Sequence, residues 1–205
     1  MSAGQDPRRI TVSDVAGIID HTQLNPDATV AQIKELCAEA SRFGFWAVCV
    51  SPIHIGRCKD LLFGSPVKIC TVVGFPLGAG SIASRAFEAK NAESLGADEI
   101  DMVINIGALR DGAWGMVEDD IASVVNATSE NIITKVILEN CYLTEEEKIK
   151  GCHLAMAAGA DFVKTSTGFG PSGATIEDVA LMRKTVGDES GVKAAGGIRD
   201  LQTAL

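Results

Sequence analysis

Lysines and aspartates at the ends of apolar segments are the residues whose types and spacing could do chemistry together. The most prominent is Lys164, which follows the large apolar residues Phe162 and Val163. An ammonium group in such a setting is costly to bury unless it is paired or loses its charge. A lysine that reacts as the neutral amine is the nucleophile that forms a Schiff base with a carbonyl substrate. A lysine that extends to water is the alternative for an isolated position, so the interpretation depends on its neighbours.

Two further residues favour chemistry at Lys164. Lys193 ends another apolar stretch, and Asp101 lies inside the apolar segment 99–105. A second ammonium near Lys164 would disfavour its protonation, and partial burial acts in the same direction. Asp101 could pair with the lysine that stays charged and move protons through it. With Asp20 and Lys135 these residues would form one interdependent cluster, and the alternative is a buried ion-pair network that only fixes strand register.

Alternating apolar and helical segments must position these side chains. The pattern predicts seven strands and a helix after each of them, which favours an all-parallel α/β sheet. Such a series indicates a TIM (β/α)₈-type barrel with only seven βα units visible in this sequence, with polar groups at the carboxyl ends of its strands. The expected strands cover residues 17–22, 45–51, 67–74, 99–105, 132–139, 161–168 and 191–197.

Composition sets the domain organisation. The 205 residues are enough for one substantial core, and we expect a polar tail over residues 1–9 followed by a single barrel domain over 10–205. The net charge of −9, without a basic run, argues against nucleic acid as a partner. No apolar run is long enough to span a membrane. The six cysteines contain no C-x-x-C pair and favour a reducing, cytoplasmic setting.

Two glycine-containing loops could bind a phosphate group. One follows Lys164 and runs from Gly168 to Gly173, and the other contains Gly196 and Gly197. Exposed backbone N–H groups in such loops suit a phosphate dianion. Each loop alone is a weak signal, because glycines between a strand and a helix are ordinary turn residues.

Six motifs in this order closely resemble the deoxyribose-phosphate aldolase family, from about Val15 to the last residue. They are Asp20-His-Thr22, Val72-Val-Gly-Phe-Pro-Leu-Gly78, Glu99-Ile-Asp-Met-Val103, Lys135-Val-Ile-Leu-Glu139, Lys164-Thr-Ser-Thr-Gly-Phe169 and Lys193-Ala-Ala-Gly-Gly-Ile-Arg199. The resemblance implies a class I aldolase on a TIM barrel. Such an enzyme reversibly cleaves 2-deoxy-D-ribose 5-phosphate to acetaldehyde and D-glyceraldehyde 3-phosphate, in carbohydrate and deoxyribonucleotide catabolism.

The resemblance also implies residue roles. Lys164 would be the Schiff-base lysine, Lys193 the lysine that tunes it, and Asp101 the acid/base partner acting with a water. The substrate would be bound by Asp20, Thr22, Thr165, Gly168, Gly196 and Gly197. Cys49 is expected near the pocket as a packing residue. We expect no metal and no cofactor, a small sugar-phosphate substrate, and a homodimer.

The resemblance also concerns the end of the chain. Family members continue into an eighth strand with a Gly/Ser-rich phosphate loop and a tail ending in tyrosine. Neither follows Leu205, so we expect a barrel that is C-terminally incomplete in this sequence. Alternatives to a working aldolase are an impaired family member that acts only as a sugar-phosphate-binding or interaction module, and a class I aldolase for another phosphorylated aldehyde or ketone.

Overall fold

Seven parallel strands in sequence order form the sheet of this protein. The computed structural model describes residues 10–205, so the polar tail expected over residues 1–9 lies outside the described residues. Each strand pairs in parallel with the next, which confirms the predicted α/β barrel type with seven βα units. The strands are β1 Asp20–Gln23, β2 Ala47–Val50, β3 Lys68–Val73, β4 Glu99–Val103, β5 Ile133–Ile137, β6 Phe162–Lys164 and β7 Gly191–Lys193.

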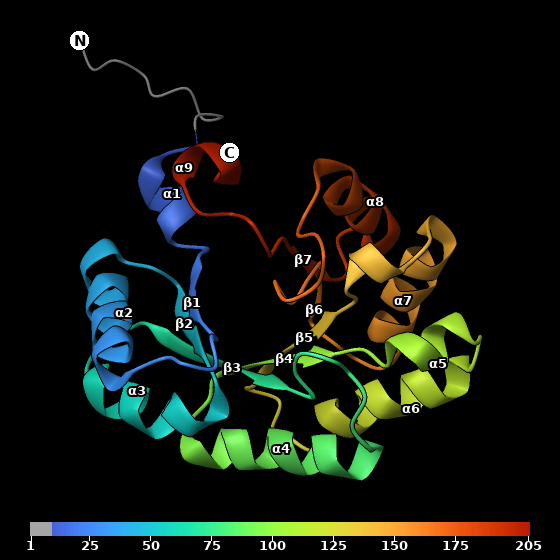
Figure 1. Cartoon of the computed structure of the whole chain (residues 1–205), viewed down its shortest axis with the longest axis horizontal. Helices are drawn as coiled ribbons and strands as arrows, with labels where there is room; N and C mark the ends of the chain where they lie inside the picture. Colours follow the sequence, from blue (N-terminus) through green and yellow to red (C-terminus); the bar gives the residue numbers. More distant parts are fainter. Residues whose placement is uncertain (1–9) are drawn as a thin grey trace.

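Helices cover the outside of the sheet (Figure 1). Capping residues begin several of them: Thr29 and Thr144 form complete capping boxes, as their sequence spacing predicts. The helices are α1 Val12–Ala16, α2 Val30–Phe43, α3 Ile55–Leu61, α4 Ile82–Leu95, α5 Ile106–Arg110, α6 Trp114–Val125, α7 Glu145–Ala157, α8 Ile176–Val186 and α9 Leu201–Ala204, with short 3₁₀ turns η1 Pro52–His54 and η2 Asn140–Tyr142.

Apolar side chains on the two faces of the sheet form separate clusters. The larger cluster packs the outward strand residues, such as Val48 and Ile100, against the helices. The smaller cluster contains Cys49 and Cys70 and packs against Phe75. Because side chains alternate across a strand, residues next to these outward positions point into the barrel interior. The interior is therefore where the polar residues of β4, β5, β6 and β7 meet.

The first strand begins later than the sequence pattern predicted. Gly17 caps α1, and the amides of Ile18 and Ile19 donate to carbonyl groups of that helix at 3.2 and 3.1 Å. These bonds keep both isoleucines in the turn that leaves the helix, so β1 begins only at Asp20 and contains both Asp20 and Thr22. Within residues 10–205, β1 and β7 are the two edges of the sheet.

Candidate active site

Lys164 and Lys193 are the last residues of neighbouring strands and lie in register. Paired residues of parallel strands point to the same face, so both side chains enter the barrel interior. The Nζ atoms of Lys164 and Lys193 both donate to Oδ2 of Asp101, at 2.6 and 2.9 Å. The structure therefore brings together the three residues that the sequence predicted for catalysis.

Asp101 is the centre of the charged cluster and is completely buried in β4. Burial alone would raise its pKa. The positive charges of Lys164, Lys193 and Lys135 outweigh that effect and hold the pKa of Asp101 well below its usual range. The Cys70 thiol also donates to Oδ1 of Asp101, at 3.3 Å. Asp101 is thus an ionised carboxylate that both amines contact.

Lys135 pairs with Asp101 across β4 and β5 and completes the cluster. Its Nζ atom lies 2.9 Å from Oδ1 of Asp101 and also contacts Glu99 and Asp20. Burial lowers the pKa of Lys135. The nearby Cys70, Asp101, Asp20 and Glu99 outweigh this effect, so the pKa lies well above the ordinary lysine value. The carboxylate of Glu99 also accepts from the Trp46 indole at 2.5 Å.

Glu99 is the member of this cluster that the sequence reasoning missed, since it was assigned only to the start of a strand. The signal that could have found it is its spacing: residues two apart on a strand share one face, so Glu99 must lie on the same side as Asp101.

Asp20 holds Lys193 from the other side. Its carboxylate accepts from the Nζ atom of Lys193, while the same Nζ atom contacts Asp101. Burial opposes the charge of Lys193, but Asp101 and Asp20 attract it, so the pKa of Lys193 lies above the ordinary lysine value. Lys193 is therefore a positively charged amine beside Lys164, and its role as the lysine that tunes Lys164 stays a prediction. That Lys164 reacts as the uncharged amine stays a prediction.

The remaining predicted binding residues surround the carboxyl ends of β1, β6 and β7. Thr22 is exposed on β1, and its hydroxyl donates to the carbonyl of Asp20 at 2.8 Å. Thr165 is buried directly after Lys164, and its hydroxyl exchanges bonds with Ala195 at 3.0 and 3.1 Å. Together these contacts fix the start of the loop after β6 against the loop after β7.

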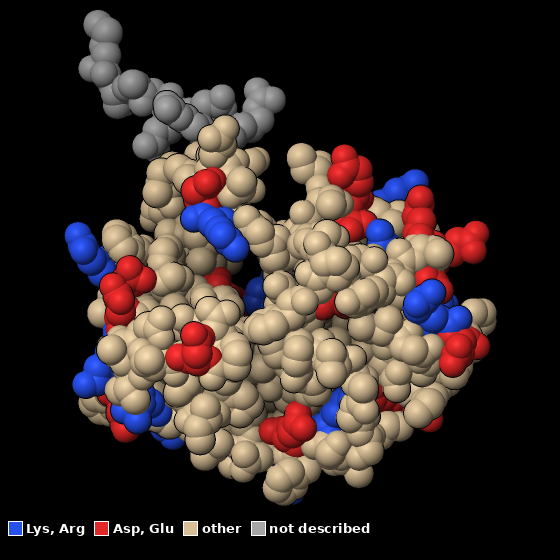
Figure 2. All heavy atoms as spheres, viewed as in Figure 1, with Lys and Arg blue, Asp and Glu red and all other residues tan. Residues whose placement is uncertain are grey.

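The three predicted glycines lie in those two loops. Gly168, Gly196 and Gly197 all have positive φ angles, of 86°, 88° and 88°, which favour glycine over residues with a Cβ atom. The two loops touch, because the Ala174 amide donates to the Gly196 carbonyl at 3.1 Å. The structure thus places these glycines in two touching loops, which follow the strands that carry Lys164 and Lys193. The space-filling view shows a hollow near its centre with acidic and basic side chains at the floor (Figure 2).

Cysteine and carboxylate groups in this cluster also lie close enough to hold a metal ion by spacing alone. Cys49, Cys70 and Asp101 form one such set, and Asp20, Cys70 and Glu99 form another. However, the Lys135 ammonium already contacts Asp20, Glu99 and Asp101 and lies 3.6 Å from the Cys70 sulfur. The positive charge that these donors surround is therefore supplied by the chain itself. Cys49 is completely buried in the small interior cluster, as expected of a packing residue.

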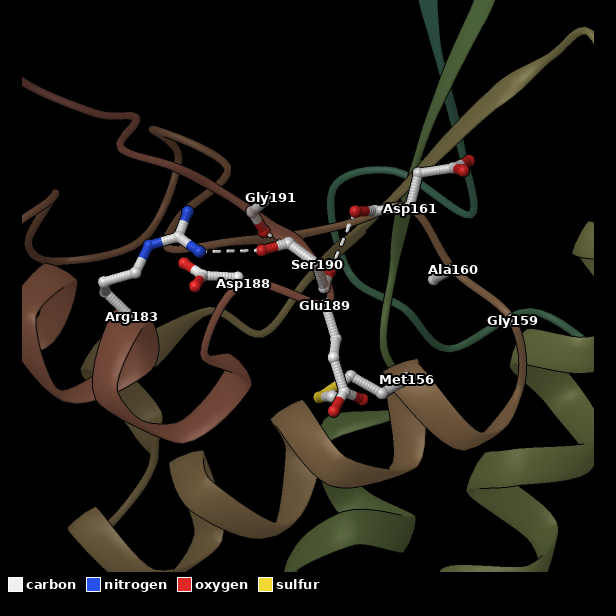
Figure 3. Close-up of a pocket in the computed structure, with 9 residues that line it drawn as sticks. All are labelled: Met156, Gly159, Ala160, Asp161, Arg183, Asp188, Glu189, Ser190 and Gly191. Carbon is white, nitrogen blue, oxygen red and sulfur yellow. Dashed lines mark hydrogen bonds between the residues drawn. The ribbon is translucent and has the colours of Figure 1, made fainter.

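A separate cavity of about 660 Å³ lies at the amino-terminal ends of strands β6 and β7, away from the ends that carry Lys164 and Lys193 (Figure 3). Its polar groups hold the backbone: Arg183 donates to the Ser190 carbonyl at 2.9 Å, and the Ser190 hydroxyl donates to the Asp161 carbonyl at 2.8 Å. Asp161 also accepts from the Thr134 amide at 2.8 Å. These groups position the start of the strands, and the lysine cluster remains the candidate for chemistry.

The chain matches proteins of known family over nearly its whole length. The DeoC/LacD family aldolase description matches residues 15–205. The deoxyribose-phosphate aldolase of Geobacillus sp. (strain WCH70) is 57% identical over 192 residues, covering 94% of this chain and 86% of that protein. The deoxyribose-phosphate aldolase of Lysinibacillus sphaericus (strain C3-41) is 58% identical over 187 residues, covering 91% of this chain and 84% of that protein.

A solved structure supports the same relationship. The tetrameric deoxyribose phosphate aldolase from Aeropyrum pernix superposes with a TM-score of 0.87 at 32% identity, covering 95% of this chain and 82% of that one. No helix among residues 10–205 combines the length and apolar character needed to cross a membrane. With the cluster of Lys164, Lys193 and Asp101 inside a parallel barrel sheet, these similarities show that the chain belongs to the DeoC/LacD family of aldolases.

Proposed function

We propose that this chain is a deoxyribose-phosphate aldolase. It would reversibly cleave 2-deoxy-D-ribose 5-phosphate to acetaldehyde and D-glyceraldehyde 3-phosphate, as a carbon–carbon lyase that forms a Schiff base. The observation that supports this most strongly is the contact of two lysine amines with one buried carboxylate, Lys164 and Lys193 on Asp101. That arrangement offers a nucleophilic amine, a lasting positive charge and a proton acceptor within one pocket.

Lys164 is the proposed nucleophile. Its uncharged Nζ atom attacks the C1 aldehyde carbon of the open-chain sugar, and uptake of a proton with loss of water gives a protonated imine. The imine draws electrons from the C2–C3 bond when the proton of the C3 hydroxyl is removed. Cleavage of that bond releases D-glyceraldehyde 3-phosphate and leaves an enamine on Lys164. Protonation of the enamine at C2 and hydrolysis of the imine then release acetaldehyde.

Asp101 and Lys193 are proposed to move the proton of the C3 hydroxyl together with a water molecule. The pKa of Asp101 is held well below its usual range by the surrounding lysines, so the carboxylate would pass the proton on more readily than keep it. Lys193 stays positively charged beside it and would stabilise the negative charge that develops on the sugar oxygen.

The substrate is proposed to extend from Lys164 toward the two glycine loops. Asp20 and Thr22 on β1, with Thr165, would contact the sugar. The backbone N–H groups around Gly168, Gly196 and Gly197 would bind the 5-phosphate. Support comes from the contact between the two loops and from the exposure of Gly168 and Gly197, where an added Cβ atom would meet nothing within 4 Å.

We also infer that the protein works as a homo-oligomer in the cytoplasm, with a homodimer as the expected form. The Aeropyrum pernix relative is tetrameric. All six cysteines of this chain are unpaired and five are buried, as is typical of a reducing compartment. Sedimentation velocity at micromolar concentration tests the assembly, and a monomer at every concentration would contradict it.

Turnover of 2-deoxy-D-ribose 5-phosphate tests the proposed function. Release of acetaldehyde would be followed with a coupled alcohol dehydrogenase, using Lys164→Met as the inactive control. The proposal predicts that cleavage occurs with the wild-type chain and is absent with the variant. Binding of the sugar phosphate without turnover, by a chain shown to be folded by circular dichroism, would contradict it.

A further inference from the structure

Phe75 and Phe169 meet edge to face over the interior of the barrel. Their ring centroids lie 5.3 Å apart and their planes cross at 89°. Phe75 belongs to the loop between β3 and α4, and Phe169 belongs to the loop between β6 and α8. In the sheet order β4 and β5 lie between these strands, so the ring contact must pass across the ends of β4 and β5. Those strands carry Asp101 and Lys135.

Buried anchors hold the loop of Phe75 in place. Arg85, completely buried on α4, donates to the Val103 carbonyl at 2.8 Å and also to the Gly78 carbonyl. Its guanidinium pairs with the buried Asp120 at 2.6 Å. Gly78 lies so close to the end of β4 that a Cβ atom there would overlap the Ile104 carbonyl oxygen. The loop is therefore fixed against β4 by a charge pair that takes no direct part in the proposed chemistry.

A second anchor holds the loop of Phe169. Glu139 has a left-handed backbone conformation (φ 56°), which is uncommon for residues other than glycine, and its side chain is buried. Its carboxylate accepts from both the hydroxyl and the amide of Thr167. The Thr167 hydroxyl in turn accepts from the Phe169 amide at 3.0 Å. Both rings are thus carried by loops with fixed backbones, as is required of side chains that limit the size of a substrate.

The exposure of the charged side chains agrees with a covered side and an open side. Those of Asp101 and Lys135 are 0% and 4% exposed, whereas that of Lys193 is 17% exposed. Phe75 packs against the small interior cluster that contains Cys70, whose sulfur contacts Asp101. The aromatic pair therefore covers the β4–β5 side of the pocket, while the β7 side stays more accessible.

From this arrangement we propose that the Phe75–Phe169 pair limits the size of the acceptor aldehyde. The proposal rests on the proposed function, in which C1 is bound to Lys164 and the phosphate lies at the glycine loops. Phe169 directly follows Gly168, so the aromatic pair belongs to the same loop that is proposed to bind the phosphate. The path between Lys164 and the glycine loops holds carbons C3 to C5, which form the acceptor aldehyde in the synthetic direction. The two carbons from acetaldehyde remain at Lys164, away from the pair.

The experiment compares Phe75→Ala, Phe169→Ala and their double variant with the wild-type chain in aldol addition of acetaldehyde to propanal and to hexanal. Removing either ring opens the same space, so each variant should raise the hexanal-to-propanal ratio of kcat/KM by about tenfold. The double variant should gain less than the product of the two single changes, because the rings hold each other. Phe63→Ala is the matched control: this ring is 93% exposed in the connection between α3 and β3, at the other end of the barrel.

A second readout separates this proposal from the proposed function. Exchange of the α-hydrogens of acetaldehyde with deuterium oxide needs Lys164, the enamine and a group that moves the proton, none of which belongs to the aromatic pair, so it should be retained in all variants. An unchanged aldehyde ratio with retained exchange would overturn the role of the pair. Loss of exchange in Phe169→Ala with its fold intact would also overturn this role, because the pair would then act on the acetaldehyde that is bound to Lys164. Absence of exchange in the wild-type chain would contradict the proposed function itself and remove the premise of the inference.

Discussion

Replacing Asp101 with asparagine removes the carboxylate that three lysines share and keeps nearly the same side-chain shape. The positive charges of Lys135, Lys164 and Lys193 would then face only Asp20 and Glu99. The cluster would hold one unbalanced positive charge in a buried site. We predict a large loss of stability at neutral pH that becomes smaller as the pH rises.

The magnitude follows from the contact distances. At an effective dielectric constant of about 20, a charge pair at the 2.6 Å of Lys164 and Asp101 is attracted by about 6 kcal/mol. Loss of three such attractions would be very costly. The variant can instead release a proton from one lysine, which removes the unbalanced positive charge. From an ordinary lysine pKa of about 10.4, neutralising one ammonium costs about 4.6 kcal/mol at pH 7 and about 1.9 kcal/mol at pH 9. These costs limit the loss, and the value at pH 7 agrees with the roughly 3–5 kcal/mol typical of breaking a buried ion pair.

The sign of the pH dependence is specific to the variant. Its folded state would bind one proton fewer than its unfolded state, so its free energy of unfolding rises with pH. In the wild-type chain, the lowered pKa of Asp101 and the raised pKa of Lys193 leave both groups charged, folded or unfolded, between pH 7 and 9. Neither of these two groups therefore adds such a slope in the wild-type chain. The difference between the two proteins should shrink by about 1.4 kcal/mol for each pH unit.

Urea unfolding at pH 7, 8 and 9, followed by circular dichroism, measures this difference. Lys68→Gln is the control, since it removes an exposed ion pair with Asp98 and should cost less than about 1 kcal/mol at every pH. A cost for Asp101→Asn below about 1 kcal/mol, or one that does not change with pH, would refute the charge balance described for the cluster.

Three further outcomes follow from individual contacts. Lys193→Met should lower kcat for cleavage of 2-deoxy-D-ribose 5-phosphate by about 10²–10⁴-fold, since it removes the charge beside Asp101, and a loss below about threefold in steady-state assays would count against that role. Gly78→Ala should lower the free energy of unfolding in urea by roughly 1–3 kcal/mol, because Gly78 has a φ of +65° and a Cβ atom there would overlap the Ile104 carbonyl. Gly56→Ala is the control and should not destabilise the chain, since nothing lies within 4 Å of its new Cβ atom. Thr144→Ala should cost about 1 kcal/mol through loss of the α7 capping box, and Thr144→Ser should restore most of it in thermal unfolding.

Local patterns were sufficient to predict the order of the seven strands and the members of the central charge cluster other than Glu99. Lys164 and Lys193 each end an apolar run, and parallel pairing in register makes them point the same way. Both amines can reach Asp101, because β4 lies inside the sheet between β3 and β5 and Asp101 points to the same interior. The late start of β1 was not predictable from apolar residues, because Ile18 and Ile19 continue the turn of α1 through backbone bonds that leave no trace in hydropathy.

The contacts between loops could not be read from a single sequence. Phe75 and Phe169 are separated by many residues and by two strands of the sheet, so their meeting depends on the curvature of the barrel. Arg85 and Asp120 likewise appear as ordinary helix charges until the packing of α4 against α6 buries them. In the sequence Glu139 is only the last residue of the expected strand over 132–139, because its left-handed backbone and its bonds to Thr167 arise from tertiary contacts.

Reductive trapping of the imine tests the central claim most directly. The wild-type chain would be incubated with acetaldehyde and sodium borohydride, digested, and analysed by peptide mass spectrometry. The account predicts one ethyl group, attached to the Nζ atom of Lys164, with no comparable labelling of Lys193 or Lys135. Those two amines each pair with a carboxylate besides Asp101: Lys193 with Asp20, and Lys135 with Asp20 and Glu99. Modification of Lys193 in preference to Lys164, or no modification of either in the folded protein, would contradict it.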